Sequence, residues 1–188
     1  MSMPRTADEP WTVARWRELE FREGERYEVI EGELVVTGIP ALRHARAVAE
    51  LARPVDDFVR AMGLGEVYQY WAPVFLNEYN VYLPDFVVFR SGAASKADWE
   101  ELDTPMLAVE VLSPASAKYD RGAKRQRYQA AGVDEYWVVD LDAQLIERWR
   151  PGEARPEILG DQLSWQPPGA AEPLTVDLRA YFSRAVAG

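Results

Sequence analysis

The clearest pattern of apolar and polar positions lies in the second half of the chain. An apolar run over residues 106–112 predicts a buried strand, which the Ser113–Pro114 pair ends. A segment with helical spacing begins near Lys118 and ends at Gly132, and a second apolar run covers residues 136–140. These features predict a strand–helix–strand unit around which the other elements can be placed.

The N-terminal region predicts a short helix followed by a β-hairpin. Thr12 is suited to cap a helix whose apolar residues recur at helical spacing and that ends near Gly24. Residues 26–36 then alternate between apolar and polar side chains around Glu31–Gly32, which is the pattern of a hairpin. The residues predicted to pack beneath it are Tyr27, Val29, Leu34 and Val36.

The middle of the chain predicts a long helix and several strands. Residues 41–62 carry apolar side chains along one helical face, and His44 lies on the same face. Pro54 should kink or divide this helix because it lacks the N–H that would bond the carbonyl of Glu50. Strands are predicted at residues 65–70, 72–76 and 83–89, with a turn at residues 77–82 and a polar loop with one helical turn at residues 91–104.

The last part of the chain predicts further strands and a closing helix. Residues 144–150 alternate in polarity and predict an outer strand that pairs with residues 136–140. Short strands are predicted at residues 157–159 and 163–165, and residues 176–185 predict a helix capped by Asp177.

The length of 188 residues, with 48% hydrophobic and 28% charged residues, predicts one soluble globular domain over residues 1–188. We divide it into an N-terminal arm (1–25), a core (26–150) and a C-terminal extension (151–188). No apolar run reaches the roughly 20 residues that span a bilayer, and the N-terminus lacks the apolar core of a signal peptide. The sequence therefore predicts a cytoplasmic protein without a membrane segment.

The chain has no cysteine and one histidine, which limits its metal chemistry. The absence of cysteine excludes disulfides, zinc–thiolate sites and cysteine nucleophiles, and a single histidine excludes a site built from several imidazoles. Any metal site must therefore consist mainly of oxygen ligands, which suits Mg²⁺ or Mn²⁺.

The charge distribution is uneven. A net charge of −10 argues against a surface coated for nonspecific nucleic-acid binding. Residues 118–127 nevertheless hold five basic residues and one acid, a local balance of +4. An ordinary solvated helix face is one interpretation, and contact with backbone phosphates is the other. The candidate nucleic-acid-binding residues are Lys118, Arg121, Arg125 and Arg127.

Two carboxylates stand in apolar strands, and a third group can reach them. Glu110 lies in the apolar run 106–112, and Asp85 is the single acid in the predicted strand 83–89. Ionising a buried carboxylate requires a compensating cation, and a metal ion is one candidate. Asp120, Lys124 and Tyr128 follow at i, i+4 and i+8, so they share one helical stripe. Two carboxylates and an amine are the parts that metal-dependent phosphodiester hydrolysis needs.

Simpler structural explanations remain open for each of these residues. Asp85 could cap a turn at a strand start, and Glu110 could pair with an arginine. His44 could be a hydrogen-bonded core histidine or support the site. Glu33 could be an exposed strand acid or point toward the metal. Tyr128 is expected to pack between helix and sheet with its hydroxyl near the site.

Several stretches resemble known families. Pro84–Asp85 followed by Glu110–Val111–Leu112 resembles the PD-(D/E)xK nuclease superfamily. The chain is also similar to the Uma-two family of bacterial restriction-endonuclease-like proteins. This similarity lies in five stretches that together span most of the chain: YEVIEGEL, PDFVVF, EVLSPAS, KYDRGAKRQRY and AGVDEYWVVD. The resemblance implies an α/β (α+β) mixed sheet with a restriction-endonuclease-like αβββαβ core, an N-terminal helix and hairpin, and a C-terminal β extension.

The same resemblance implies the roles of the site residues. Asp85 and Glu110 would be metal ligands, with the carbonyl of Val111 as a third. The superfamily's lysine position is Leu112 here, so Lys124 would have to take that role, with Asp120 one turn before it. If the two acids repel each other, Asp85→Asn should keep or raise the melting temperature while abolishing activity.

The sequence thus predicts a DNA endonuclease that depends on Mg²⁺ or Mn²⁺. The alternative is a noncatalytic nuclease-like module that binds nucleic acid or protein. DNA is the expected partner, and a homodimer is compatible with cleavage of two strands.

Overall fold

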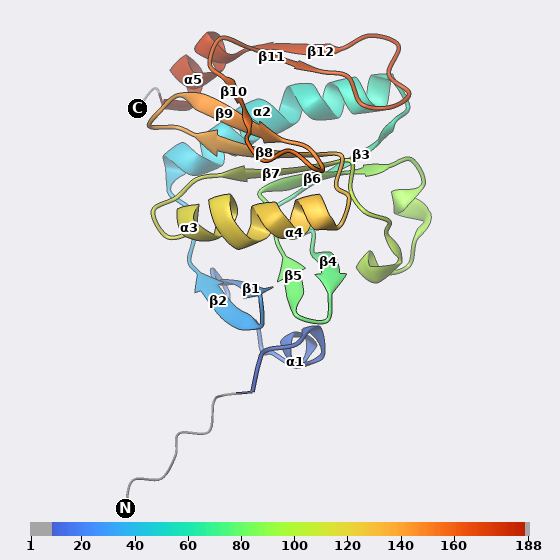
Figure 1. Ribbon diagram of the computed structural model, residues 1–188, viewed down its shortest axis with the longest axis vertical. Coiled ribbons are helices and arrows are strands. Elements are labelled where there is room, and N and C mark those ends of the chain that lie inside the picture. The colour runs from blue at the N-terminus through green and yellow to red at the C-terminus, as the bar shows by residue number, and fades with distance from the viewer. Residues whose placement is uncertain (1–8, 187–188) are drawn as a thin grey trace, which may run out of the picture.

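The structure is a computed structural model that describes residues 9–186, so residues 1–8 of the predicted N-terminal arm and residues 187–188 of the predicted C-terminal extension lie outside the described residues. A six-stranded sheet lies at its centre (Figure 1). In spatial order its strands are β10 (Glu157–Leu159), β9 (Leu145–Trp149), β8 (Glu135–Asp140), β7 (Leu107–Val111), β6 (Phe86–Arg90) and β3 (Gly65–Gln69). Strands β7 and β8 run parallel, and the other neighbours are antiparallel.

Helices cover both faces of this sheet (Figure 1). One face carries α2 (Leu42–Ala61) and α5 (Leu178–Val186). The other carries a continuous helical segment of α3 (Ala117–Tyr119), the π-helical turn η3 (Asp120–Lys124) and α4 (Arg125–Ala130). The order α2–β3–β6–β7–α4–β8 is the restriction-endonuclease-like αβββαβ core that the sequence predicted, within a mixed α+β fold.

Alternation along β7 decides which side chains face which layer. Val109 packs in the core beneath α2 and α5, whereas Ala108 packs in the core that also contains Tyr128 of α4. Glu110 therefore faces the helical segment that carries Lys124.

A second sheet lies beyond that segment (Figure 1). Its strands in spatial order are β2 (Glu33–Thr37), β1 (Arg26–Ile30), β5 (Asn80–Tyr82) and β4 (Val74–Asn77). Helix α1 (Val13–Arg17) packs against it, and the hydroxyl of Thr12 accepts a hydrogen bond from the Arg15 N–H at 3.2 Å. The predicted cap and hairpin are confirmed, and the predicted N-terminal helix is present but ends at Arg17 rather than near Gly24.

Three further details of the predicted elements are wrong. Residues 77–82 are not one turn, because β5 pairs there with β4 and β1. Val36 is 46% exposed, because edge strand β2 turns it toward a cavity. Pro54 does not divide α2, since buried residues before and after it, among them Leu51 and Val55, keep the helix against the sheet.

The C-terminal extension adds a two-stranded sheet of β11 (Gln162–Trp165) and β12 (Leu174–Asp177). Asp177 ends β12 and caps α5 by accepting a hydrogen bond from the Ala180 N–H at 2.9 Å, as predicted. The loop after β6 contains the short 3₁₀ turns η1 (Ala93–Ser95) and η2 (Trp99–Glu101). Within residues 9–186, no helix is long and apolar enough to cross a membrane.

Gly65→Ala should markedly destabilise the central sheet. Gly65 pairs with Arg90, and an added Cβ would lie 2.0 Å from the Phe89 carbonyl oxygen, a backbone atom that cannot move aside. We expect a loss of about 3 kcal/mol of unfolding free energy in urea titrations. Gly122→Ala is the control, because open space surrounds that position and alanine favours a helix. Equal stability of the two variants would contradict this account.

Candidate functional site

The structure brings Asp85 and Glu110 together. Asp85 directly precedes β6, where Phe86 pairs with Val109 of β7, so Asp85 lies across from Glu110. The Asp85 Oδ2 atom accepts a hydrogen bond from the Val111 N–H at 2.8 Å. Both acidic side chains are 1% exposed. The predicted pair is therefore buried where β6 begins and the antiparallel strand β7 ends.

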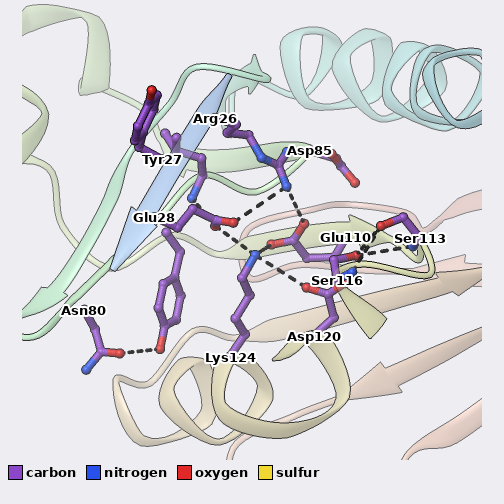
Figure 2. Close-up of polar contacts among 12 residues, drawn as sticks. Arg26, Tyr27, Glu28, Asn80, Asp85, Glu110, Ser113, Ser116, Asp120 and Lys124 are labelled. Carbon is purple, nitrogen blue, oxygen red and sulfur yellow. Dashed lines mark hydrogen bonds and ion pairs between the residues drawn. The ribbon is translucent and has the colours of Figure 1, made fainter. Parts of the chain in front are cut away.

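Lys124 reaches Glu110 of this pair from the helical segment (Figure 2). Its Nζ atom lies 2.8 Å from Glu110 Oε1, 2.8 Å from Glu28 Oε1 and 3.4 Å from Asp120 Oδ1. The predicted stripe of Asp120, Lys124 and Tyr128 is buried, even though a π-helical turn runs from Asp120 to Lys124. Such turns are rare and often occur at functional sites.

Sequence reasoning missed Arg26 and Glu28, which strand β1 adds to the cluster. Arg26 Nη1 donates to Asp85 Oδ1 at 3.0 Å, and Nη2 lies 3.9 Å from Glu110 Oε2. Glu28 is 2% exposed and also accepts a hydrogen bond from the Leu83 N–H at 2.8 Å. One signal was present in the sequence: Glu28 stands between Tyr27 and Val29 in an apolar strand, as Glu110 does in its own.

His44 and Tyr128 lie beside the cluster. His44 Nε2 is 3.1 Å from Asp85 Oδ2, so α2 contributes a residue that the helical stripe had suggested. The Tyr128 ring packs between those of Tyr82 and Tyr136, with centroids 5.4 and 4.8 Å away. Its hydroxyl has no hydrogen-bond partner among the described residues. Tyr128 is thus a packing residue at the floor of the site.

The electrostatic environment shifts the pKa values of the two central acids, Asp85 and Glu110, in opposite directions. Burial would raise the pKa of Asp85, but His44 and Arg26 lower it below its ordinary value. Burial raises the pKa of Glu110 well above its ordinary value, and Lys124 offsets only part of that rise. Burial also favours loss of the Lys124 proton, yet the surrounding carboxylates raise its pKa above the ordinary value. Two carboxyl groups with opposite shifts are a common feature of acid–base and metal sites.

The predicted phosphate-binding residues are mostly engaged with the protein's own side chains. Arg121 pairs with Asp140 and Glu147, each at 2.7 Å. Arg127 pairs with Glu31. The Arg125 guanidinium lies 4.7 Å from the centroid of the Trp149 ring, and Lys118 is exposed. Acids that are distant in sequence thus neutralise much of the basic segment, which favours the solvated-face interpretation.

Two other predicted residues differ in their placement. Glu33 is exposed at the start of β2, where it adds to the rise in the pKa of Tyr119, so it is the exposed strand acid rather than part of the cluster. Val111 directs its side chain to the opposite core, while its N–H binds Asp85. The role of its carbonyl stays a prediction.

The donor atoms suit a hard divalent cation in charge and type. Four buried carboxyl groups face two permanent cations in this cluster, which leaves an excess of two negative charges when all four are ionised; they are Glu28, Asp85, Glu110 and Asp120 against Arg26 and Lys124. Within residues 9–186, Asp120 has no hydrogen bond to its carboxylate oxygens. In this part of the chain, no group of three or more acidic or histidine side chains is arranged to hold a metal ion. Glu28, Glu110 and Asp120 converge on the Lys124 amine instead. The oxygen atoms are of the type that such an ion prefers, and in the arrangement seen they form ion pairs with Arg26 and Lys124.

A cavity of about 910 Å³ adjoins the cluster. Arg26 and His44 both line it and both contact Asp85. Its walls come from the β2–α2 connection, the turn after β3 and the Ser113–Ser116 turn after β7. Arg26 and His44 therefore lie between the cavity and the buried acids, and neither Asp85 nor Glu110 lines it.

The αβββαβ core with a buried Asp85–Glu110–Lys124 cluster defines a restriction-endonuclease-like protein. The family model of Uma2, described as "Putative restriction endonuclease", matches residues 13–179, and the chain belongs to this family.

Among solved structures, a similar chain is described as "a putative nuclease belonging to DUF820 from Anabaena variabilis ATCC 29413". It is 21% identical, with a TM-score of 0.80 over 94% of this chain and 100% of that chain. This similarity establishes the shared fold. None of the curated proteins compared with the chain matches it.

Proposed function

We propose that this protein is an endonuclease that hydrolyses phosphodiester bonds of DNA and depends on Mg²⁺ or Mn²⁺. The observation that carries the proposal is the meeting of Asp85, Glu110 and the Lys124 amine in one buried cluster beside an open cavity. The family description and the nuclease-like fold support it. The excess negative charge of the cluster supports a divalent ion.

Each residue would have a distinct task. Asp85 and Glu110, with the carbonyl of Val111, would hold the ion. When bound, such an ion polarises the phosphate and acidifies water. The Lys124 ammonium, fixed by Glu110 and Glu28, would orient water or stabilise the negative charge that develops on the phosphate. His44 keeps Asp85 oriented from the cavity side.

A noncatalytic interaction module is the second candidate. Leu112 occupies the position where the superfamily has its lysine, and Arg26 engages the acids that would hold the ion. One assay distinguishes the two candidate functions: plasmid and single-stranded DNA are incubated with the protein in the presence of Mn²⁺ or of EDTA. Cleavage in Mn²⁺ alone supports the nuclease, and intact DNA in both conditions supports the module.

Asp85→Asn should abolish cleavage and also lower stability. The loss of a metal ligand should reduce the rate about a hundredfold or more. The lowered pKa of Asp85 means that its charge stabilises the folded state above the ordinary aspartate pKa and that this contribution is lost as pH falls. The structure therefore reverses the expectation, drawn from the sequence, that this variant keeps or raises the melting temperature.

Cleavage of plasmid and melting temperature at neutral pH are the two measurements. Asp161→Asn is the matched control, because Asp161 lies in an exposed ion pair with Arg179 and does not line the cavity. It should melt and cleave like the parent protein. An Asp85→Asn protein that cleaves normally would refute the assignment of Asp85.

A further inference from the structure

The approach to the buried acids restricts the substrates that can reach them. Asp85 and Glu110 are each 1% exposed, and the adjoining cavity approaches them through Arg26 and His44, which line it and contact Asp85. At about 910 Å³ the cavity has the size of a pocket for a small organic ligand, which matches a nucleotide rather than a duplex.

Much of the cavity wall is apolar. Its lining includes Val36, Ile39, Tyr70, Trp71 and Leu112. Ile39 is 81% exposed and Trp71 is 60% exposed, which is uncommon for side chains of this size in water. These faces suit the flat rings of unstacked bases, since stacking on aromatic side chains tolerates every base.

The charged side chains of the lining are largely neutralised by one another. Arg43 pairs with Asp142, and Arg121 pairs with Asp140, each at 2.7 Å. Duplex recognition relies on cations that contact successive phosphates. The cavity therefore offers more to the base of a nucleotide than to the backbone of a duplex.

The backbone holds Trp71 at this position. Tyr70 has a φ of 64°, a left-handed backbone conformation that residues with a side chain rarely adopt. The Tyr70 N–H donates a hydrogen bond to the Asp85 carbonyl oxygen at 3.0 Å. Strained residues of this kind persist where the surrounding structure fixes them, often at functional sites. The strained turn thus links the backbone of a central acid directly to the exposed indole.

We propose that the cavity binds an unpaired nucleotide whose base stacks on Trp71, so that the substrate is single-stranded DNA or an unpaired segment rather than intact duplex. The proposal rests on the proposed nuclease function for its catalytic consequence, while the binding itself can be measured without catalysis.

The test uses a fluorescein-labelled short single strand of mixed sequence and the same strand annealed to its complement. Anisotropy titrations in EDTA report binding without cleavage. The single strand should bind about tenfold more tightly than the duplex, and Trp71→Ala should remove that advantage, whereas Trp71→Phe should keep most of it. Tyr79→Ala is the control, because Tyr79 is an exposed aromatic residue outside this cavity.

Three outcomes would overturn the proposal: tighter binding of the duplex, single-strand binding that Trp71→Ala leaves unchanged, or no binding of either oligonucleotide, as expected of a surface for a protein partner. Cleavage in Mn²⁺ is scored separately. Single-strand binding that depends on Trp71 without cleavage would uphold this proposal and refute the nuclease. Duplex cleavage that Trp71→Ala leaves unchanged would refute this proposal and uphold the nuclease.

Discussion

Lys124→Met should destabilise the protein by about 3–5 kcal/mol at neutral pH, because it removes the cation from a buried pair and leaves the charges opposite it uncompensated. Glu28, Glu110 and Asp120 all lie within ion-pair distance of its amine. Methionine fills much of the same volume, so the expected loss reflects charge rather than an empty space.

The effect of this change on stability should depend on pH. The raised pKa of Lys124 means that its contribution in the parent protein is complete below the ordinary lysine pKa and is lost only as pH rises through its folded-state value. In the variant, Glu110 and Asp120, whose pKa values burial already raises, lose their compensating charge. Acids with raised pKa values destabilise the fold as pH rises, so the deficit should be larger at about pH 8 than at about pH 5.

Urea unfolding at both pH values measures this deficit. Lys118→Met is the matched control, since Lys118 is an exposed lysine in the same segment and should change stability by less than about 0.5 kcal/mol. The double variant Lys124→Met with Glu110→Gln should recover part of the stability but no cleavage. A Lys124→Met protein as stable as the parent at both pH values would refute the central place of the amine in this cluster.

If Lys124 only took the role of the superfamily's lysine, as the sequence predicts, Lys124→Ala should abolish cleavage but leave metal binding largely intact. The structure changes that expectation, because the Lys124 amine binds Glu110 directly and also approaches Asp120. Removal of the Lys124 amine should therefore change the charge state of Glu110 and Asp120, and with it metal binding. Lys124→Arg should restore little cleavage, since the Lys124 side chain is only 1% exposed and a planar guanidinium cannot replace its compact ammonium there.

The parts of the site that local periodicity controls could be predicted from the sequence. Alternation along a strand decides the face of Glu110, and spacing of four residues along a helix places Lys124 beside Asp120. The right-handed crossover between parallel strands then brings that helix over the strand. These constraints act within the residues of one strand–helix–strand unit, so a single sequence contains them.

The contribution of β1 depends on tertiary packing and could not be predicted in the same way. Arg26 meets Asp85 across 59 positions, and Glu28 meets the Leu83 backbone across 55. Alternation in the hairpin predicted its buried side chains without indicating which element they face. The ion pair of Arg127 with Glu31 spans 96 positions, so the neutralisation of the basic segment was equally hidden.

Arg26→Met should increase the affinity for Mn²⁺ by about tenfold to a hundredfold. The acids are held between Arg26 from β1 and Lys124 from the helix (Figure 2). A unit charge at 4 Å interacts by about 4 kcal/mol at an effective dielectric constant of 20, so the loss of one repelling cation can account for a gain of this size. Without metal, the variant should melt at a lower temperature than the parent, because Asp85 and Glu110 lose a compensating charge.

Calorimetric titration and the rise in melting temperature on adding Mn²⁺ measure the affinity of the Arg26 variants. Arg26→Lys keeps the positive charge and should bind Mn²⁺ like the parent, which also provides a folded comparison if Arg26→Met is too unstable. Arg43→Met is the control for the cavity, because Arg43 pairs with Asp142 at its rim and not with the buried acids. If Arg26→Met and the parent bind Mn²⁺ equally, Arg26 does not compete with an ion, and the buried acids serve ion pairing within the fold.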